Sequence, residues 1–250
     1  MFIKEFKGDK TNKSGAYEAN FLFKKGFFYI MDNHLSATWC WLQEIDVKSK
    51  YNYFHIDRHY DLIDNKPHFK EYLNKRGIDL QGLDYEAYLN LKDDEMINMP
   101  TTGYPYPLFR FDNYLPYFFR AYPDLIENKY FATHDDGTAV NQFITYKPEI
   151  YDVFSNIKYW LKDEHKNART SGWIFNLDID YFFQGNPEFQ FLTDEYILKI
   201  CDEIKESLAY IKVVTIAMSP EFCSGWEQSY RVTKLIADYF DLDFELKNFK

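Results

Sequence analysis

The stretch FHIDRHYDL, residues 54–62, places metal-type ligands at every second position: Asp57, His59 and Asp61. They follow YNYFHI, an apolar run typical of a buried strand. Because side chains alternate along an extended chain, the three would share one side of it. Buried carboxylates need a positive partner, and carboxylates with an imidazole are ligands for divalent cations. The triplet therefore predicts a metal site at the end of this strand.

Other candidate ligands also follow apolar runs. His34 ends MDNH after one run, and Asp178 and Asp180 form LDID after GWIFNL. Four carboxylates brought together would raise one another's pKa values and repel, and two divalent cations would resolve this. Oxygen-rich ligation with some imidazole suits Mn²⁺, with Zn²⁺ and Fe²⁺ as alternatives. His134 follows the run NKYFA and Glu221 follows VVTIAMSP, so both are candidates for the same site.

Each of these pieces has a structural explanation when it is taken alone. An isolated DxD after a strand is common without metal, and a histidine such as His34 often caps a helix or lies in a core. His134 could be a turn residue before DDG, and Glu221 could be a surface acid beside a helix. The combination of ligands from separate stretches is what favours a metal site.

The elements that must position these residues alternate along the chain. Strands are expected at 26–34, 51–57, 128–137, 171–180 and 212–222, and helices at 35–45, 148–163, 193–211 and 226–239. This alternation predicts an α/β fold with a mainly parallel sheet between two layers of helices. Ligands bind outside the carboxyl ends of such strands, which is where the candidate residues fall. We expect one domain, 1–250, with a long excursion at about 62–122.

Composition narrows the class of protein. A chain of 250 residues, 46% of them hydrophobic, is sufficient for a substantial core, and a net charge of −10 argues against nucleic-acid binding. Three cysteines without CxxC spacing suit a reducing compartment. The charged N-terminal stretch and the lack of an apolar run of about 18 residues predict a cytoplasmic protein without a membrane segment. The oligomeric state is not indicated.

The motifs NH, DRHYD and LDID, in this order, resemble the ligand set of the arginase/deacetylase (ureohydrolase) superfamily. Four blocks, YIMDNHLSATWCW, FHIDRHYDL, IFNLDIDYF and TIAMSPEFCSGWE, are similar to a branch that includes the peptide arginases. Those enzymes convert arginine residues of ribosomally made precursor peptides to ornithine. The sequence departs from the superfamily pattern at Arg58, where a small residue is usual, in DNH for GDH, and in lacking a third aspartate after DxD.

The resemblance implies an arginase-like fold and a ligand set for two cations. His34, Asp57, Asp61 and Asp178 would hold one cation; Asp57, His59, Asp178 and Asp180 would hold the other, with Asp57 and Asp178 bridging. The implied substrate is an arginine-containing precursor peptide that releases urea. In that reaction Asp61 would relay a proton, His134 would exchange it with solvent, and Glu221 would bind the guanidinium through a forked pair of hydrogen bonds. Glu227 and Asp135 are rivals for the last role.

Three other functions remain open at this point. A one-metal zinc amidohydrolase of the deacetylase type would need Asp57, His59 and one later aspartate, but it leaves His34 and Asp61 without a role. A metal-stabilised protein could instead bind a peptide without catalysis. Cys223 could be a nucleophile, although no histidine is near it in sequence. The aromatic segment 101–123 could form the wall of a peptide cleft or simply pack in the core.

Overall fold

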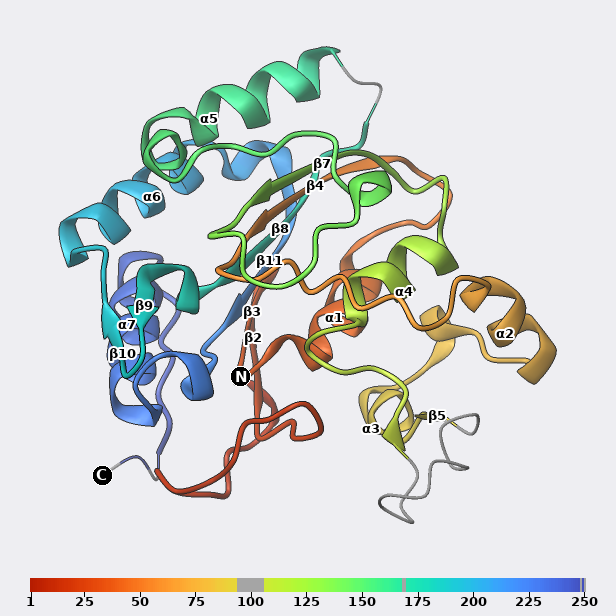
Figure 1. Cartoon of the computed structure of the whole chain (residues 1–250), viewed down its shortest axis with the longest axis horizontal. Coiled ribbons are helices and arrows are strands. Elements are labelled where there is room, and N and C mark those ends of the chain that lie inside the picture. The colour runs from red at the N-terminus through yellow and green to blue at the C-terminus, as the bar shows by residue number, and fades with distance from the viewer. Residues whose placement is uncertain (94–105, 168–169, 248, 250) are drawn as a thin grey trace.

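The computed structural model describes residues 1–93, 106–167, 170–247 and 249 (Figure 1). Its main sheet has seven strands in the order β1-β2-β3-β11-β8-β4-β7. In that order they span Phe2–Lys4, Leu22–Lys25, Phe28–Met31, Ile211–Ala217, Trp173–Asp178, Tyr51–Ile56 and Ile126–Ala132. Within this order the five strands β3, β11, β8, β4 and β7 run parallel to one another. Strands β2 and β1 add an antiparallel edge beside β3. The predicted α/β fold with a mainly parallel sheet is confirmed.

Helices cover both faces of this sheet (Figure 1). One face carries α5 (Ile150–Asn167), α6 (Asp194–Glu206) and α7 (Trp226–Tyr239). The other carries α1 (Ala37–Glu44), α2 (Phe69–Arg76), α3 (Tyr85–Leu89) and α4 (Tyr114–Ala121). Strand β4 serves both layers: Phe54 and Ile56 join the first hydrophobic cluster, whereas Tyr51 and Tyr53 join the second. This alternation explains why the strand is a continuous apolar run.

Most elements are shorter than the sequence predicts. β3 ends at Met31 because the Asn33 side chain accepts a hydrogen bond from the Leu35 backbone at 3.0 Å and starts the 3₁₀ helix η1, His34–Ser36. β7 ends at Ala132 and α6 ends at Glu206. Thr193 caps α6 by accepting a hydrogen bond from the Tyr196 backbone. Strands β1 and β2 were not predicted, since their residues are interrupted by charge.

The excursion at about 62–122 is a packed part of the second layer rather than a loose insertion. It contains α2, α3, α4 and a short pair of strands, β5 (Lys92–Asp93) and β6 (Tyr106–Pro107). Rings of Phe69 and Tyr117 stack with centroids 4.4 Å apart, and Phe109 and Tyr88 stack at 4.8 Å. Core packing therefore accounts for most of the described aromatic side chains in segment 101–123, of which 101–105 lie outside the described residues. Among the described residues no helix is long and apolar enough to cross a membrane.

Candidate metal centre

The first part of the site forms where β4 ends. The strand stops at Ile56, and the His59 backbone N–H donates to Asp57 Oδ1 at 2.6 Å, so the chain turns directly after the strand. Asp61 has a φ of 53°, in the left-handed region, and this conformation brings its side chain back toward the turn. The side chains of Asp57, His59 and Asp61 thus share a site through a turn and not through continued strand alternation. The Arg58 side chain does not join this site, and its Nε pairs with Asp136.

The second part comes from β8, which lies between β4 and β11. Asp178 is the last residue of this strand, and its Oδ1 accepts a hydrogen bond from the Asp180 backbone at 2.9 Å, which starts the 3₁₀ helix η5 (Ile179–Phe182). Asp178 Oδ2 accepts a hydrogen bond from the Ser219 hydroxyl, which follows β11. Neighbouring strand ends therefore place the LDID carboxylates beside the β4 turn.

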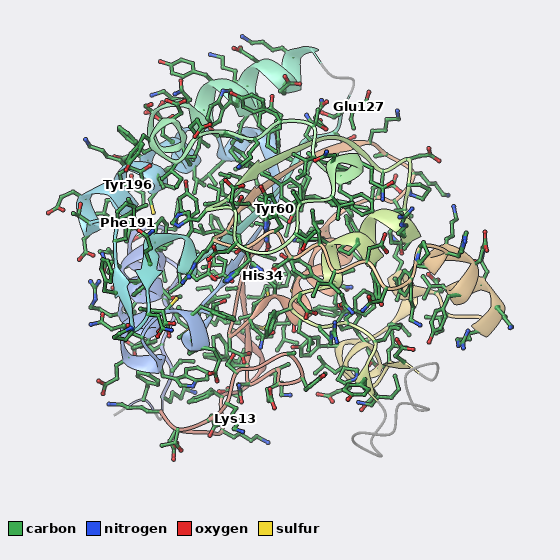
Figure 2. All side chains as sticks on the ribbon, viewed as in Figure 1. Lys13, His34, Tyr60, Glu127, Phe191 and Tyr196 are labelled. Carbon is green, nitrogen blue, oxygen red and sulfur yellow. The ribbon has the colours of Figure 1, made fainter. Side chains whose placement is uncertain are left out.

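His34 approaches the same point from β3 and lies near the centre of the molecule (Figure 2). Its Nδ1 is 3.4 Å from Asp57 Oδ2, 3.4 Å from Asp61 Oδ2 and 3.7 Å from Asp178 Oδ2. On the other side of Asp57, His59 Nδ1 is 2.8 Å from Asp180 Oδ2 and 3.5 Å from Asp57 Oδ1. The structure therefore brings all six predicted ligands together.

These residues form overlapping sets of donor atoms. In the set His34, Asp57 and Asp178, and in the set Asp57, His59 and Asp180, the ligand atoms lie within 4.8 Å of one another. Asp57 belongs to both sets and is 1% exposed. A carboxylate shared in this way can bridge two cations, one for each of its oxygens.

The electrostatics of the cluster fit a bound cation. Burial and the charges of Asp180 and Asp57 raise the pKa of Asp178 well above its usual range, and burial with the charge of Asp57 also raises the pKa of Asp180. Burial and Asp57 raise the pKa of Asp61 to about 7. Asp57 Oδ2 is buried and has no hydrogen-bond partner among the described residues. Carboxylates in such an environment repel each other unless a positive charge lies between them.

His55 belongs to the site and was not predicted. It is fully buried, its Nε2 is 3.6 Å from Asp57 Oδ2, and it forms a further possible donor set with Asp57 and Asp61. Burial lowers the pKa of this imidazole to about 4, so it is neutral near pH 7. The sequence did contain a signal, since His55 continues the every-second-residue pattern one step toward the N-terminus.

A buried polar network contacts His55 on the side away from Asp57, and it also contacts Nδ1 of His34. Asn176 Nδ2 lies 3.0 Å from His55 Nδ1 and donates to the Tyr114 hydroxyl at 3.0 Å, and that hydroxyl is 2.9 Å from His34 Nδ1. The Thr215 hydroxyl donates to Asn176 Oδ1 at 2.6 Å. Tyr114 comes from α4, so the excursion contributes directly to the orientation of His34. Such second partners fix the rotamers of ligand side chains.

Two cavities lie in front of the cluster. The inner one, about 10 Å³, is lined by Ser14, Asn33, His59, Asp61, Phe111, Asp178, Asp180, Ser219 and Phe222. The outer one, about 530 Å³, is lined by His59, Asp61, Leu62, Ile63, Asp64, Phe111, Asp112, Gly137, Thr138, Val140 and Phe222. The outer pocket therefore gives solvent access to the metal-type ligands, and the excursion supplies one of its walls.

Two predicted catalytic residues lie outside the linings of both cavities. The His134 ring packs edge-on against Tyr181 with centroids 4.9 Å apart, and burial lowers its pKa. Glu221 is exposed and accepts a hydrogen bond from the Ser14 backbone at 3.0 Å, and both Ser14 and the adjacent residue Phe222 line the inner cavity. Both residues are near the cluster, but neither is directed into it.

The structure also shows where the rival candidates Glu227, Asp135 and Cys223 lie. Glu227 is exposed and pairs with Lys10, and Asp135 pairs with Lys147. Cys223 is fully buried. Burial and the nearby carboxylates of Asp180 and Asp178 raise the pKa of its thiol well above the usual value, which disfavours the thiolate that nucleophilic attack requires.

The arrangement defines a buried histidine–aspartate cluster at the carboxyl end of a mainly parallel sheet, with donor sets suitable for divalent cations. Comparison with protein-family models, with curated proteins and with solved structures gave no match to this chain. The chemistry of the cluster and of the two cavities in front of it is therefore the basis for assigning a function.

Proposed function

We propose that this protein is a binuclear metal hydrolase of the arginase/deacetylase type that hydrolyses guanidinium groups. The observation that carries the proposal is the pair of buried donor sets that share Asp57. His34, Asp57, Asp61 and Asp178 would hold one cation, and Asp57, His59, Asp178 and Asp180 the other. Four carboxylates and two imidazoles suit Mn²⁺, with Zn²⁺ and Fe²⁺ as alternatives.

Divalent cations bound here would lower the pKa of a bound water so that hydroxide is available near neutral pH. The overall reaction adds water to the guanidinium carbon and breaks its bond to the side-chain nitrogen, which gives urea and a primary amine. That amine must gain a proton. Asp61 is suited to carry it, because this carboxylate lines both the inner and the outer cavity and so faces the leaving group.

The lining of the outer pocket bears on the substrate. No lysine or arginine is present among the described residues that line it, whereas Asp64 and Asp112 are. The α-carboxylate of free arginine would find no lysine or arginine in this lining, and the two carboxylates that it would meet are paired with Arg120 and Arg110. An arginine residue within a peptide has no such charge, so the pocket favours peptidyl arginine, and the substrate we propose is a ribosomally made precursor peptide.

A one-zinc deacetylase accounts for fewer of the contacts. It would use Asp57, His59 and one later aspartate. His34 Nδ1, however, lies 3.4 Å from Asp57 Oδ2 and 3.4 Å from Asp61 Oδ2. Its buried donor set shares Asp57 with the set of His59 but does not include His59. These contacts have an explanation when a second cation is bound beside the first.

The direct test is urea release. The purified protein with Mn²⁺ is incubated with an arginine-containing peptide with blocked termini, with free arginine and with agmatine. We expect urea and an ornithine residue from the peptide, and no urea when Asp57→Asn replaces the wild type. A reaction with free arginine or agmatine alone would reject the peptide substrate, and one zinc per chain with no urea from any substrate would reject the binuclear guanidinium hydrolase.

A further inference from the structure

Two phenylalanines stand between the inner and the outer cavity. Phe111 and Phe222 line both cavities, and their rings meet edge to face at an interplanar angle of 87° with centroids 5.8 Å apart. Phe222 also lies against His59, with ring centroids 4.8 Å apart. His59 and Asp61 line both cavities, but a group passing from the outer pocket to Asp178 and Asp180, which line only the inner cavity, must pass these two rings.

Both rings are held by backbone contacts close to them. The Ile63 backbone N–H donates to Asp112 O at 3.0 Å, which joins the Phe111 segment to the chain that follows the β4 turn. The Phe222 backbone N–H donates to Ser219 O at 2.9 Å within the 3₁₀ helix η7 (Pro220–Phe222). The two rings thus come from segments that are anchored to the same side-chain cluster.

The inner cavity is narrow compared with any substrate. Its volume of about 10 Å³ corresponds to about one water molecule. His59 and Asp61 already face the outer pocket, whereas a group that reaches Asp178 and Asp180 through the inner cavity must lie beside the rings of Phe111 and Phe222 or separate them. A flat cation is suited to this position, since a guanidinium stacks on aromatic faces and gains a cation–π attraction.

We propose that Phe111 and Phe222 form an aromatic neck that determines specificity by admitting a slender, planar, cationic side-chain head to the metal centre. This inference rests on the proposed function and adds the basis of its selectivity. An unsubstituted guanidinium passes the neck, whereas one carrying additional methyl groups is too thick at its end. The outer pocket, with Leu62, Ile63 and Val140 in its wall, receives the rest of the substrate.

The test compares two peptides that differ only at the target residue, arginine or Nω,Nω-dimethylarginine. Urea or dimethylurea release is measured for the wild type, Phe111→Ala, Phe222→Ala and Phe222→Leu, with Tyr159→Leu as a control. Tyr159 is an aromatic residue of α5 that is 54% exposed and outside both cavity linings. Phe222→Leu keeps an apolar side chain of similar size and removes only the π face. Circular dichroism and the Mn²⁺ content of each variant show that folding and metal binding are retained.

We expect Phe222→Leu to raise KM for the arginyl peptide about 3- to 30-fold with little change in kcat, as the loss of a cation–π contact predicts. The alanine variants should also increase the dimethylarginine-to-arginine ratio of kcat/KM at least about tenfold, and Tyr159→Leu should change neither. If the wild type releases urea but these ratios do not change in the folded variants, the neck is rejected and the proposed function stands. If the wild type with Mn²⁺ releases no urea from any guanidinium, both are rejected.

Discussion

Asp57 and Asp178 belong to the same buried cluster, yet their removal should affect the metal-free protein in opposite directions. Burial opposes ionisation of Asp57, but the imidazoles around it outweigh burial and hold its pKa well below the usual range. Burial and the charges of Asp180 and Asp57 raise the pKa of Asp178 well above that range. The charge of Asp57 therefore stabilises the metal-free fold, whereas the charge of Asp178 destabilises it.

The size of each effect follows from the contacts. Asp57→Asn leaves buried imidazoles without their anionic partner, and breaking such a buried pair costs about 3–5 kcal/mol. For a chain of this size that corresponds to a fall in Tm of about 6–20 °C. Asp178→Asn keeps an oxygen for the Asp180 backbone N–H, and the Ser219 hydroxyl can rotate to accept from the new amide. Replacing a buried charge by a neutral group of the same shape is often stabilising by about 1–3 kcal/mol, which should raise Tm by about 2–12 °C in EDTA.

Mn²⁺ should reverse the order of the Tm values of Asp178→Asn and the wild type. Each site filled at 100 times its Kd stabilises the wild type by about 2.7 kcal/mol, so two sites raise its Tm by about 10–20 °C. Both asparagine variants lose a proposed bridging ligand and most of this gain. Asp178→Asn is then the more stable protein in EDTA and the less stable one in Mn²⁺.

Thermal melts followed by circular dichroism, in EDTA and in Mn²⁺, measure all of these shifts. Asp163→Asn is the control, because it removes a carboxylate whose side chain is 65% exposed and should behave as the wild type does. The electrostatic reasoning would be refuted if the two variants moved Tm in the same direction in EDTA. The metal centre would be refuted if Mn²⁺, Zn²⁺ and Fe²⁺ each left the wild-type Tm unchanged.

Three further outcomes are expected. The pKa of Asp61 is about 7 in the folded protein and about 3.9 in the unfolded chain. Asp61 therefore adds to the free energy of unfolding below pH 3.9, and this contribution is lost as the pH rises through 7. The metal-free protein should accordingly lose about 2 kcal/mol between pH 5 and pH 7.5 in urea unfolding, whereas the Mn²⁺-induced gain should increase over this range because ligands must be deprotonated. Tyr114→Phe removes the acceptor of the Asn176 amide and should cost about 1–3 kcal/mol in the same measurement; no change would exclude the network as a support of the site. His134→Ala should keep urea release within about threefold, since the ring packs on Tyr181 outside the cavities, and a loss of about 100-fold or more would instead identify it as the proton shuttle.

The sequence was sufficient to predict the ligand cluster because one physical rule links the motifs. Parallel strands end at the same edge of a sheet, so residues after three separate apolar runs had to meet if those strands were neighbours. The order β3-β11-β8-β4 fulfils that condition. His34 and Asp180, which are 146 positions apart, thereby reach one site around Asp57.

Other features were inaccessible because they depend on tertiary contacts. The turn that brings Asp61 back depends on a positive φ at an aspartate, which the sequence does not encode distinctly from a continued strand. Phe111 and Tyr114 lie in an aromatic segment in which most rings are core, so nothing in their spacing distinguishes the residue that faces the pocket from the residue that contacts His34. His55 was accessible through its spacing, but a histidine inside an apolar strand is usually a core residue.

The excursion links the fold to the chemistry of the ligands. Tyr114 on α4 contacts His34 Nδ1 within a buried network, so packing of the second hydrophobic cluster restrains the position of a metal-type ligand. Phe111 lies three residues earlier on the same segment and lines both cavities in front of the cluster. A change in how α4 packs would therefore move the support of His34 and the width of the entrance together. Metal affinity and substrate selectivity should consequently respond jointly to core substitutions in α4.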